Sequence, residues 1–117
     1  MRVRLFLMVS AWSTFAFGLA GCRQLPPSKP ASEWTHKEAS GAVIYQAKCA
    51  RCHYPTSTRS LHGPGLQAIT KVKAMPSGAP PTDERLTEVI LNGRQMMPPT
   101  QLTDQQLSDL LAYLHTL

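Results

Sequence analysis

The stretch Cys49-Ala50-Arg51-Cys52-His53 decides how the rest of this chain is interpreted. Two thiols three positions apart lie on one face of a helical turn, and the histidine follows the second thiol directly. A Cys-x-x-Cys pair alone also occurs in redox dithiols and zinc sites, but the added histidine is typical of covalent haem attachment. There the thiols form thioethers with the two vinyl groups of the haem, and the histidine gives the iron an axial nitrogen. We therefore predict one covalently bound haem c, held by Cys49, Cys52 and His53.

The first 21 residues have the composition of an export signal. Two arginines precede an apolar run over residues 5–20, which is too short for a membrane-spanning helix. The run ends in Leu19-Ala20-Gly21-Cys22, which resembles the bacterial lipobox, where the signal is cut before the cysteine and the cysteine carries lipid. We expect a lipoprotein signal peptide over 1–21 and a lipid anchor on Cys22. The alternative is ordinary cleavage that leaves a soluble protein with a free terminal cysteine.

The three cysteines agree with this division of the chain. One cysteine is used by the lipid and two by the haem, so that none remains for a disulfide. The bacterial cell envelope is an oxidising compartment, where a cysteine pair without a cofactor tends to oxidise.

The charge of the chain argues against nucleic acid as a partner. The net charge of +5 includes two arginines of the signal, and without them ten basic and seven acidic residues leave +3. This is too small a charge for nucleic-acid binding, and export argues against it independently. Five basic residues and no acidic residue lie over 48–81. Such a stretch would suit either an acidic redox partner or a solvated surface around the haem carboxylates.

The chain after the signal divides into a tether over 22–34 and one domain over 35–117. The tether contains three prolines and no apolar periodicity. The T-x-x-E pattern at Thr35 is a capping box, which predicts a first helix that runs to about Cys49. Gly41 lies inside this helix at a cost of about 1 kcal/mol relative to alanine, which suggests that another helix crosses closely there.

Two further helices are predicted in the second half of the chain. One begins after Thr82, has acidic residues in its first turn and ends at Gly93. The other begins with a capping box at Thr103 and carries leucines at helical spacing. No run of alternating β-branched residues indicates a sheet. The sequence therefore predicts an all-α fold.

The order of these motifs resembles the class I mono-haem cytochromes c from Thr35 to Leu117. Gly41-x-x-x-Tyr45-x-x-x-Cys49-x-x-Cys52-His53 is similar to the opening helix of this family, although the family often has glycine where this chain has Tyr54. Gly63-Pro64-Gly65-Leu66 is similar to its G-P-x-L loop, and residues 90–98 are similar to its I-x-N-G-x-x-x-M-P segment. The resemblance implies a small cytochrome c fold, with three main helices plus short turns wrapped around one haem.

The resemblance also implies roles for residues outside the attachment motif. The carbonyl of Pro64 would accept the Nδ1 proton of His53, and Met97, directly before a proline, would be the second axial ligand. Tyr113 would pack against Gly41.

Three other residues are weaker candidates for the second axial position. Met96 is the nearest alternative, because a shift of one residue would still bring its sulfur near the haem. Met75 also precedes a proline but lacks the helix and glycine context. His62 adjoins the loop expected on the same side as His53.

Both axial positions would be filled in such a site, which implies electron transfer and no enzymatic activity. We expect a monomeric cytochrome c, anchored by lipid on the periplasmic side of a bacterial membrane. It would exchange electrons with redox proteins of the respiratory chain or with a periplasmic oxidoreductase. The alternative is a dedicated haem c subunit of a periplasmic dehydrogenase or reductase complex. A thiol-disulfide oxidoreductase would need a thioredoxin-like βαβ setting, which the sequence lacks. A haem sensor would need Met97 to dissociate easily.

Overall fold

The first long helix, α1, begins where its capping box predicts. The structure is a computed structural model that describes residues 24–117, so the predicted signal peptide and Cys22 lie outside the described residues. Helix α1 spans His36–Lys48. The Thr35 hydroxyl accepts a hydrogen bond from the backbone N–H of Glu38, and the Glu38 carboxylate accepts one from the backbone N–H of Thr35. Two of the free N–H groups at the start of the helix are thereby satisfied.

The other two helices also begin at threonine caps. Helix α2 (Asp83–Asn92) is capped by Thr82 and ends at Gly93, whose φ of 74° is in the left-handed region that glycine tolerates best. Helix α3 (Asp104–Leu114) begins with the second predicted capping box, at Thr103. The described chain contains these three α-helices and no β-strand, and the all-α prediction is therefore confirmed.

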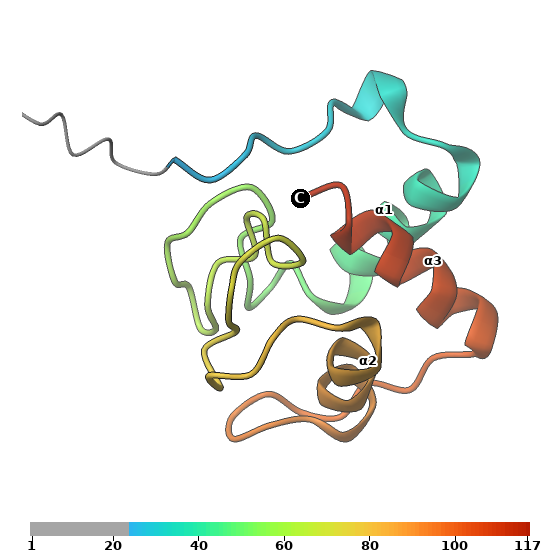
Figure 1. Ribbon diagram of the computed structural model, residues 1–117. Helices are drawn as coiled ribbons and strands as arrows, with labels where there is room; N and C mark the ends of the chain where they lie inside the picture. The colour runs from blue at the N-terminus through green and yellow to red at the C-terminus, as the bar shows by residue number, and fades with distance from the viewer. Residues whose placement is uncertain (1–23) are drawn as a thin grey trace, which may run out of the picture.

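Helices α1 and α3 cross in close contact, and α2 lies beside them (Figure 1). The crossing occurs at Gly41. A Cβ atom at this position would collide with the backbone carbonyl of Asp109, and it would lie 2.8 Å from the Cβ of Tyr113. The expected contact between Gly41 and Tyr113 is therefore present, and it explains why glycine occupies the middle of a helix.

The hydrophobic core gathers around this crossing. The ring centroid of Tyr113 lies 5.2 Å from that of Tyr45 on α1. Further buried apolar side chains come from α2, from α3 and from the segments around them: Ile69, Leu86, Ile90, Leu110, Leu114 and Leu117. The core thus joins all three helices to the long connection between α1 and α2.

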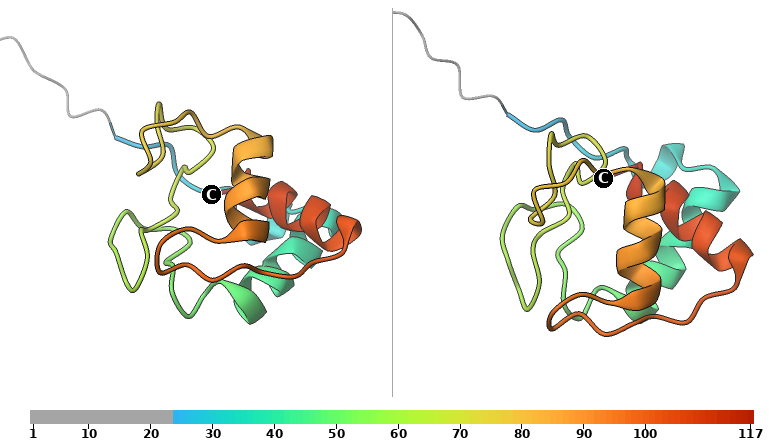
Figure 2. Two further views of the ribbon diagram at one scale, coloured as in Figure 1. Left: turned by 90° about the horizontal axis from the view of Figure 1, so that it is seen from below. Right: turned by 60° about the horizontal axis from the view of Figure 1, so that its bottom comes forward.

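Two connections lie on one side of the helices. Figures 1 and 2 show that the segment after α1 and the segment between α2 and α3 both project to this side. Their backbone is irregular: the isolated bridge pairs His53–Ser60 and Arg94–Met97 are the β-type pairings within residues 24–117. The residues predicted to bind haem lie on these two connections.

A short 3-10 helix, η1 (Ala31–Glu33), precedes α1 and was not predicted. Directly after it, the indole of Trp34 packs edge-on against Tyr113 with ring centroids 5.3 Å apart. The Trp34 Nε1–H donates a hydrogen bond to the backbone carbonyl of Lys29 over 3.1 Å. The residues before α1 are thus packed on α3.

Lys29 connects this segment to both ends of the domain. Its backbone N–H donates to the carbonyl of Thr116 over 2.6 Å, and its ammonium lies 2.8 Å from the carboxylate of Glu38. The hydrogen bond from Lys29 holds the pKa of Glu38 below its ordinary value. Part of the stretch 22–34, which we expected to be a flexible tether, is therefore bound to the domain from Lys29 onward. No helix within residues 24–117 is long and apolar enough to cross a membrane.

The crossing predicts that Gly41→Ala destabilises the protein, although glycine-to-alanine changes usually stabilise a helix. Gly41→Ala would stabilise an open helix by about 1 kcal/mol. Here the new methyl group collides with backbone, and we expect a net loss of about 1–3 kcal/mol in the free energy of unfolding. Urea denaturation of the haem-loaded protein measures this difference. In the matched control Ala47→Gly, on the exposed face of α1, we expect a loss of about 1 kcal/mol. A Gly41→Ala protein more stable than wild type would contradict the crossing.

Candidate haem site

The two cysteines and the histidine of the motif occupy a helical turn that continues α1. The backbone N–H of Cys49 donates to the carbonyl of Tyr45, and the N–H groups of Cys52 and His53 both donate to the carbonyl of Cys49, over 2.9 and 3.0 Å. Both thiols are free and half-buried. One rigid turn therefore carries the two thiols and the imidazole.

The imidazole of His53 is held by the predicted proline loop. Its Nδ1 lies 2.8 Å from the carbonyl oxygen of Pro64. A carbonyl can only accept a hydrogen bond, so Nδ1 carries the proton and Nε2 keeps the lone pair that a metal needs. A Cβ at Gly63 would collide with the ring, and the N–H of Gly63 donates to the carbonyl of Cys52 over 2.8 Å. The contact implied for Pro64 is present, and Gly63 allows the loop to lie against the ring.

Tyr45 stabilises the backbone of the same segment. Its side chain is fully buried, and its hydroxyl donates a hydrogen bond to the backbone carbonyl of His53 over 2.6 Å. Burial raises the pKa of Tyr45, which keeps the phenol protonated and able to donate. The sequence indicated an aromatic residue at this position, but a phenylalanine would satisfy that pattern equally well. The hydrogen bond was therefore missed.

Tyr54 occupies the position where the resembling family often has glycine. Among the described non-glycine residues only Ala68 and Gln95 have a positive φ, so the turn after His53 does not require glycine. The carbonyl of Tyr54 accepts a hydrogen bond from the N–H of Leu66 over 2.8 Å, and its side chain is 38% exposed. The side chain of Tyr54 is thus partly exposed, and its backbone carbonyl is bonded to the end of the proline loop.

Met97 closes a tight turn after α2. The N–H of Arg94 donates to the carbonyl of Met97 over 3.0 Å, and the N–H of Met97 donates to the carbonyl of Arg94 over 2.9 Å. Gln95 has a φ of 52° within this turn. The two adjacent methionines differ sharply, because Met96 is 86% exposed whereas Met97 is half-buried and packs against the core.

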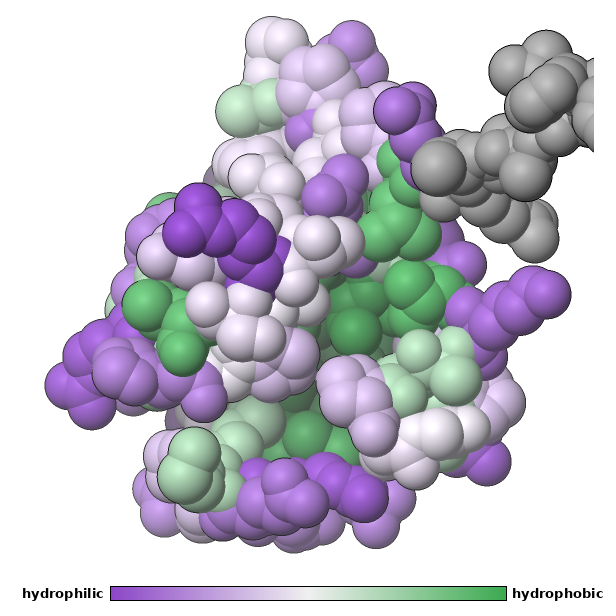
Figure 3. Space-filling view, turned by 90° about the vertical axis from the view of Figure 1, so that its left-hand side faces the viewer, coloured by the Kyte–Doolittle hydropathy of each residue, from purple (hydrophilic) through white to green (hydrophobic). Residues whose placement is uncertain are grey.

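A recess opens on the side to which the two connections project. The space-filling view of this face shows a hollow with apolar side chains along its floor and polar side chains around its rim (Figure 3). Of the weaker candidates for the axial position, His62 is exposed, whereas Met75 is half-buried and packs against the core.

The thiol of Cys49 is poorly suited to disulfide exchange. Burial, and secondarily the nearby charge of Cys52, raises the pKa of Cys49 to about 11. Such a thiol is almost entirely protonated at neutral pH, whereas exchange enzymes use a thiolate with a lowered pKa.

A comparison with known protein families finds a match for this chain. Residues 36–114 match the sequence model of the family described as cytochrome c oxidase, cbb3-type, subunit III. The match runs from the start of α1 to the end of α3 and includes both connections. The chain matches none of the curated proteins with which it was compared.

The hydrogen bond beneath His53 can be tested by its removal. Tyr45→Phe leaves the buried carbonyl of His53 without its donor, and we expect a loss of about 1–3 kcal/mol in the free energy of unfolding. Urea denaturation of the haem-loaded variant measures the change. Tyr54→Phe is the matched control, because this side chain is partly exposed and makes no side-chain hydrogen bond within the described chain. Equal stabilities for Tyr45→Phe and wild type would contradict a stabilising role for this bond.

Proposed function

Because the chain belongs to the cbb3-type cytochrome c oxidase subunit III family, it is a c-type cytochrome, and we propose that it works as a membrane-anchored mono-haem electron carrier. The family establishes a domain that transfers electrons through covalently bound haem c, and Cys49, Cys52 and His53 fit its attachment motif. The axial ligands, the membrane anchor and the location in the bacterial cell envelope are our proposal.

The described residues fit such a haem. Cys49 and Cys52 are free on one helical turn, and His53 presents Nε2 because Pro64 takes the proton on Nδ1. The apolar floor of the recess suits the faces of a large aromatic ring system (Figure 3). When bound, the haem supplies an iron that stores and releases one electron by cycling between Fe(II) and Fe(III).

The proposal rests chiefly on one pair of observations, an oriented His53 and a half-buried Met97. Of the two neighbouring methionines, Met97 packs against the core and Met96 points to solvent, which favours Met97 as the second ligand. If His53 and Met97 both bind the iron as proposed, no coordination position would remain for a substrate. We therefore expect electron transfer through the haem edge and no catalytic activity.

The surrounding contacts would keep the proposed iron ligands in place when the iron changes its charge. Pro64 fixes the orientation of the imidazole and makes it a stronger donor to the metal. Tyr45 fixes the backbone that carries the same histidine. A thioether such as Met97 is a soft, neutral ligand that favours the ferrous state and raises the reduction potential.

The anchor would hold this centre close to the membrane. Cys22 lies outside the described residues, and the chain is bound to the domain from Lys29 onward. The seven Cα–Cα steps from Cys22 to Lys29 span at most about 25 Å when the chain is fully extended. A lipoprotein with several acyl chains would remain in the membrane and move within its plane. Its redox partners would accordingly be proteins of the respiratory chain, or a periplasmic oxidoreductase, at the same membrane.

A second candidate function is a dedicated haem c subunit of a larger envelope dehydrogenase or reductase. The description of the matching family, which names a subunit of an oxidase, favours this alternative. A partner that remains bound during gel filtration of a detergent extract would support the subunit, and a protein that elutes alone would support the free carrier.

The identity of the second ligand can be tested with a pair of variants. We expect Met97→Leu to abolish the near-infrared sulfur-to-iron band of the oxidised protein and to lower its reduction potential, because the iron loses its soft ligand. Met96→Leu should change neither quantity, since this side chain is 86% exposed. Optical spectra and a redox titration of both variants measure these effects. A wild-type protein without the band, or loss of the band in Met96→Leu alone, would contradict the ligand assignment.

The lipid anchor requires a separate test. We expect Cys22→Ser to move the protein from the membrane fraction to the soluble fraction, with covalent haem retained on a denaturing gel stained for haem. The mass of the N-terminal peptide from the wild-type protein reports the lipid directly. A wild-type protein found in the soluble fraction with an unmodified Cys22 would refute the anchor and leave the haem assignment intact.

A further inference from the structure

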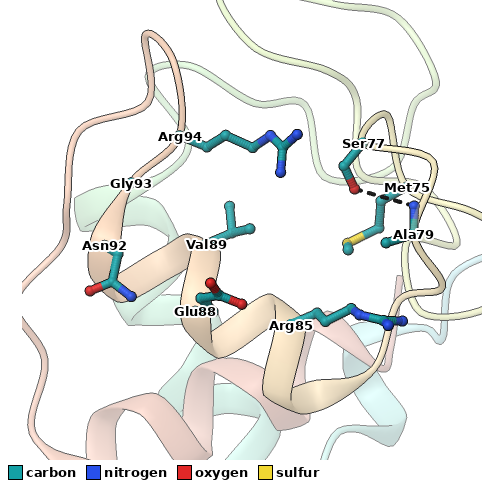
Figure 4. A pocket seen from close by; sticks show the side chains of 9 residues that line it. All are labelled: Met75, Ser77, Ala79, Arg85, Glu88, Val89, Asn92, Gly93 and Arg94. Atoms are coloured by element: carbon teal, nitrogen blue, oxygen red, sulfur yellow. Dashed lines mark hydrogen bonds between the residues drawn. The ribbon is translucent and has the colours of Figure 1, made fainter.

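The surface between α2 and the loop at residues 75–79 is hollowed. A pocket of about 190 Å³ opens there, and the turn that carries Met97 forms its upper wall (Figure 4). Val89 and Met75 give it an apolar lining. Its charged residues are Arg85 and Glu88 on α2 and Arg94 at the beginning of the turn, and the loop at 75–79 contributes none.

The guanidinium of Arg94 points into this pocket (Figure 4). Figure 4 shows the side chain extending from the turn toward Ser77 and Met75. Within residues 24–117, no hydrogen bond or salt bridge of the Arg94 side chain is present, and Glu88 forms no salt bridge with either arginine. Arg85 is engaged differently, because its guanidinium donates to the carbonyl of Pro80 over 3.2 Å. Arg94 is thus a five-donor group that is aimed into the pocket and makes no hydrogen bond or salt bridge with Glu88 or any other described residue.

We propose that Arg94 binds a carboxylate of the haem, a propionate, in this pocket. This inference rests on the proposed function, in which Met97 binds the iron. Arginine pairs with carboxylates through two parallel hydrogen bonds, and a haem carries two carboxylates on an otherwise apolar ring. Val89 and Met75 would contact the apolar edge while Arg94 meets the charge.

The same backbone unit carries the guanidinium and the axial ligand. Two backbone hydrogen bonds join Arg94 to Met97 across the four-residue turn, so the backbone positions that carry the two side chains are fixed relative to each other. A positive charge near the haem disfavours the ferric state, which carries one more positive charge than the ferrous state. Arg94 therefore binds the haem carboxylate and also raises the reduction potential.

The test is a redox titration of the haem-loaded protein. Arg94→Gln removes the cation, so at a fixed solution potential we expect the ratio of Fe(III) to Fe(II) to rise by up to about tenfold. For a one-electron couple, a tenfold rise corresponds to a fall of about 59 mV in the reduction potential. Arg94→Lys keeps the charge and should restore most of the potential. Arg85→Gln, in the same pocket but bonded to Pro80, is the matched control, and we expect a smaller fall.

Spectra separate this electrostatic effect from damage to the turn. Each Arg94 variant should retain the sulfur-to-iron band. An unchanged potential in Arg94→Gln would overturn the proposal. The proposal would also be overturned if Arg94→Gln lowered the potential but lost the band, and Arg94→Lys restored neither. The effect would then come from displacement of Met97. Absence of the band from the wild-type protein refutes the proposed ligation itself, and is thus distinguishable from failure of the Arg94 assignment.

Discussion

The close approach of α1 and α3 at Gly41 is the constraint on which the site depends. Without a side chain at this position, the carbonyl of Asp109 and the Cβ of Tyr113 come as near as backbone packing allows. Helix α1 then continues without a break into the turn of Cys49, so the crossing fixes the direction in which the thiols and the imidazole are presented. Tyr45, one turn after Gly41 on the same face, completes this path with its hydrogen bond to the segment of the motif.

Beyond the helices, the site is held by a small number of contacts to backbone. Pro64 accepts from the imidazole of His53, and Gly63 donates to the carbonyl of Cys52, while the remaining connection between α1 and α2 has little regular structure. A domain of this size buries a limited apolar area, and small domains commonly need covalent or metal links as well. Haem c bound to Cys49 and Cys52 would supply such links, and with the proposed ligand Met97 it would tie both connections to the helical frame.

Features governed by local sequence could be predicted, and features governed by long-range contacts could not. Threonine caps and a glycine stop act within one turn, which is why all three helices begin close to their expected residues and α2 ends at Gly93. The contacts of Gly41 with Tyr113 and of His53 with Pro64 were accessible only through resemblance to a family. The bond from Lys29 to Thr116 and the packing of Trp34 on Tyr113 of α3 overrode a proline-rich pattern that predicted a tether. The direction of the Arg94 side chain depends on a turn with positive φ at Gln95, which no motif indicated.

The two proposed iron ligands are held by different numbers of contacts. This difference bears on whether the protein is an electron carrier or a haem sensor. His53 is held through its ring by Pro64 and through its backbone by Tyr45. Met97 packs against the core, but among the described residues its backbone is bonded only within its own turn, to Arg94, and this segment rejoins α2 through the hydrogen bond from the N–H of Thr100 to the carbonyl of Ile90. Any change in coordination would therefore begin on the Met97 side. A propionate bound to Arg94 would add a second attachment between this turn and the haem, and would favour a carrier whose ligands stay in place when the iron changes charge.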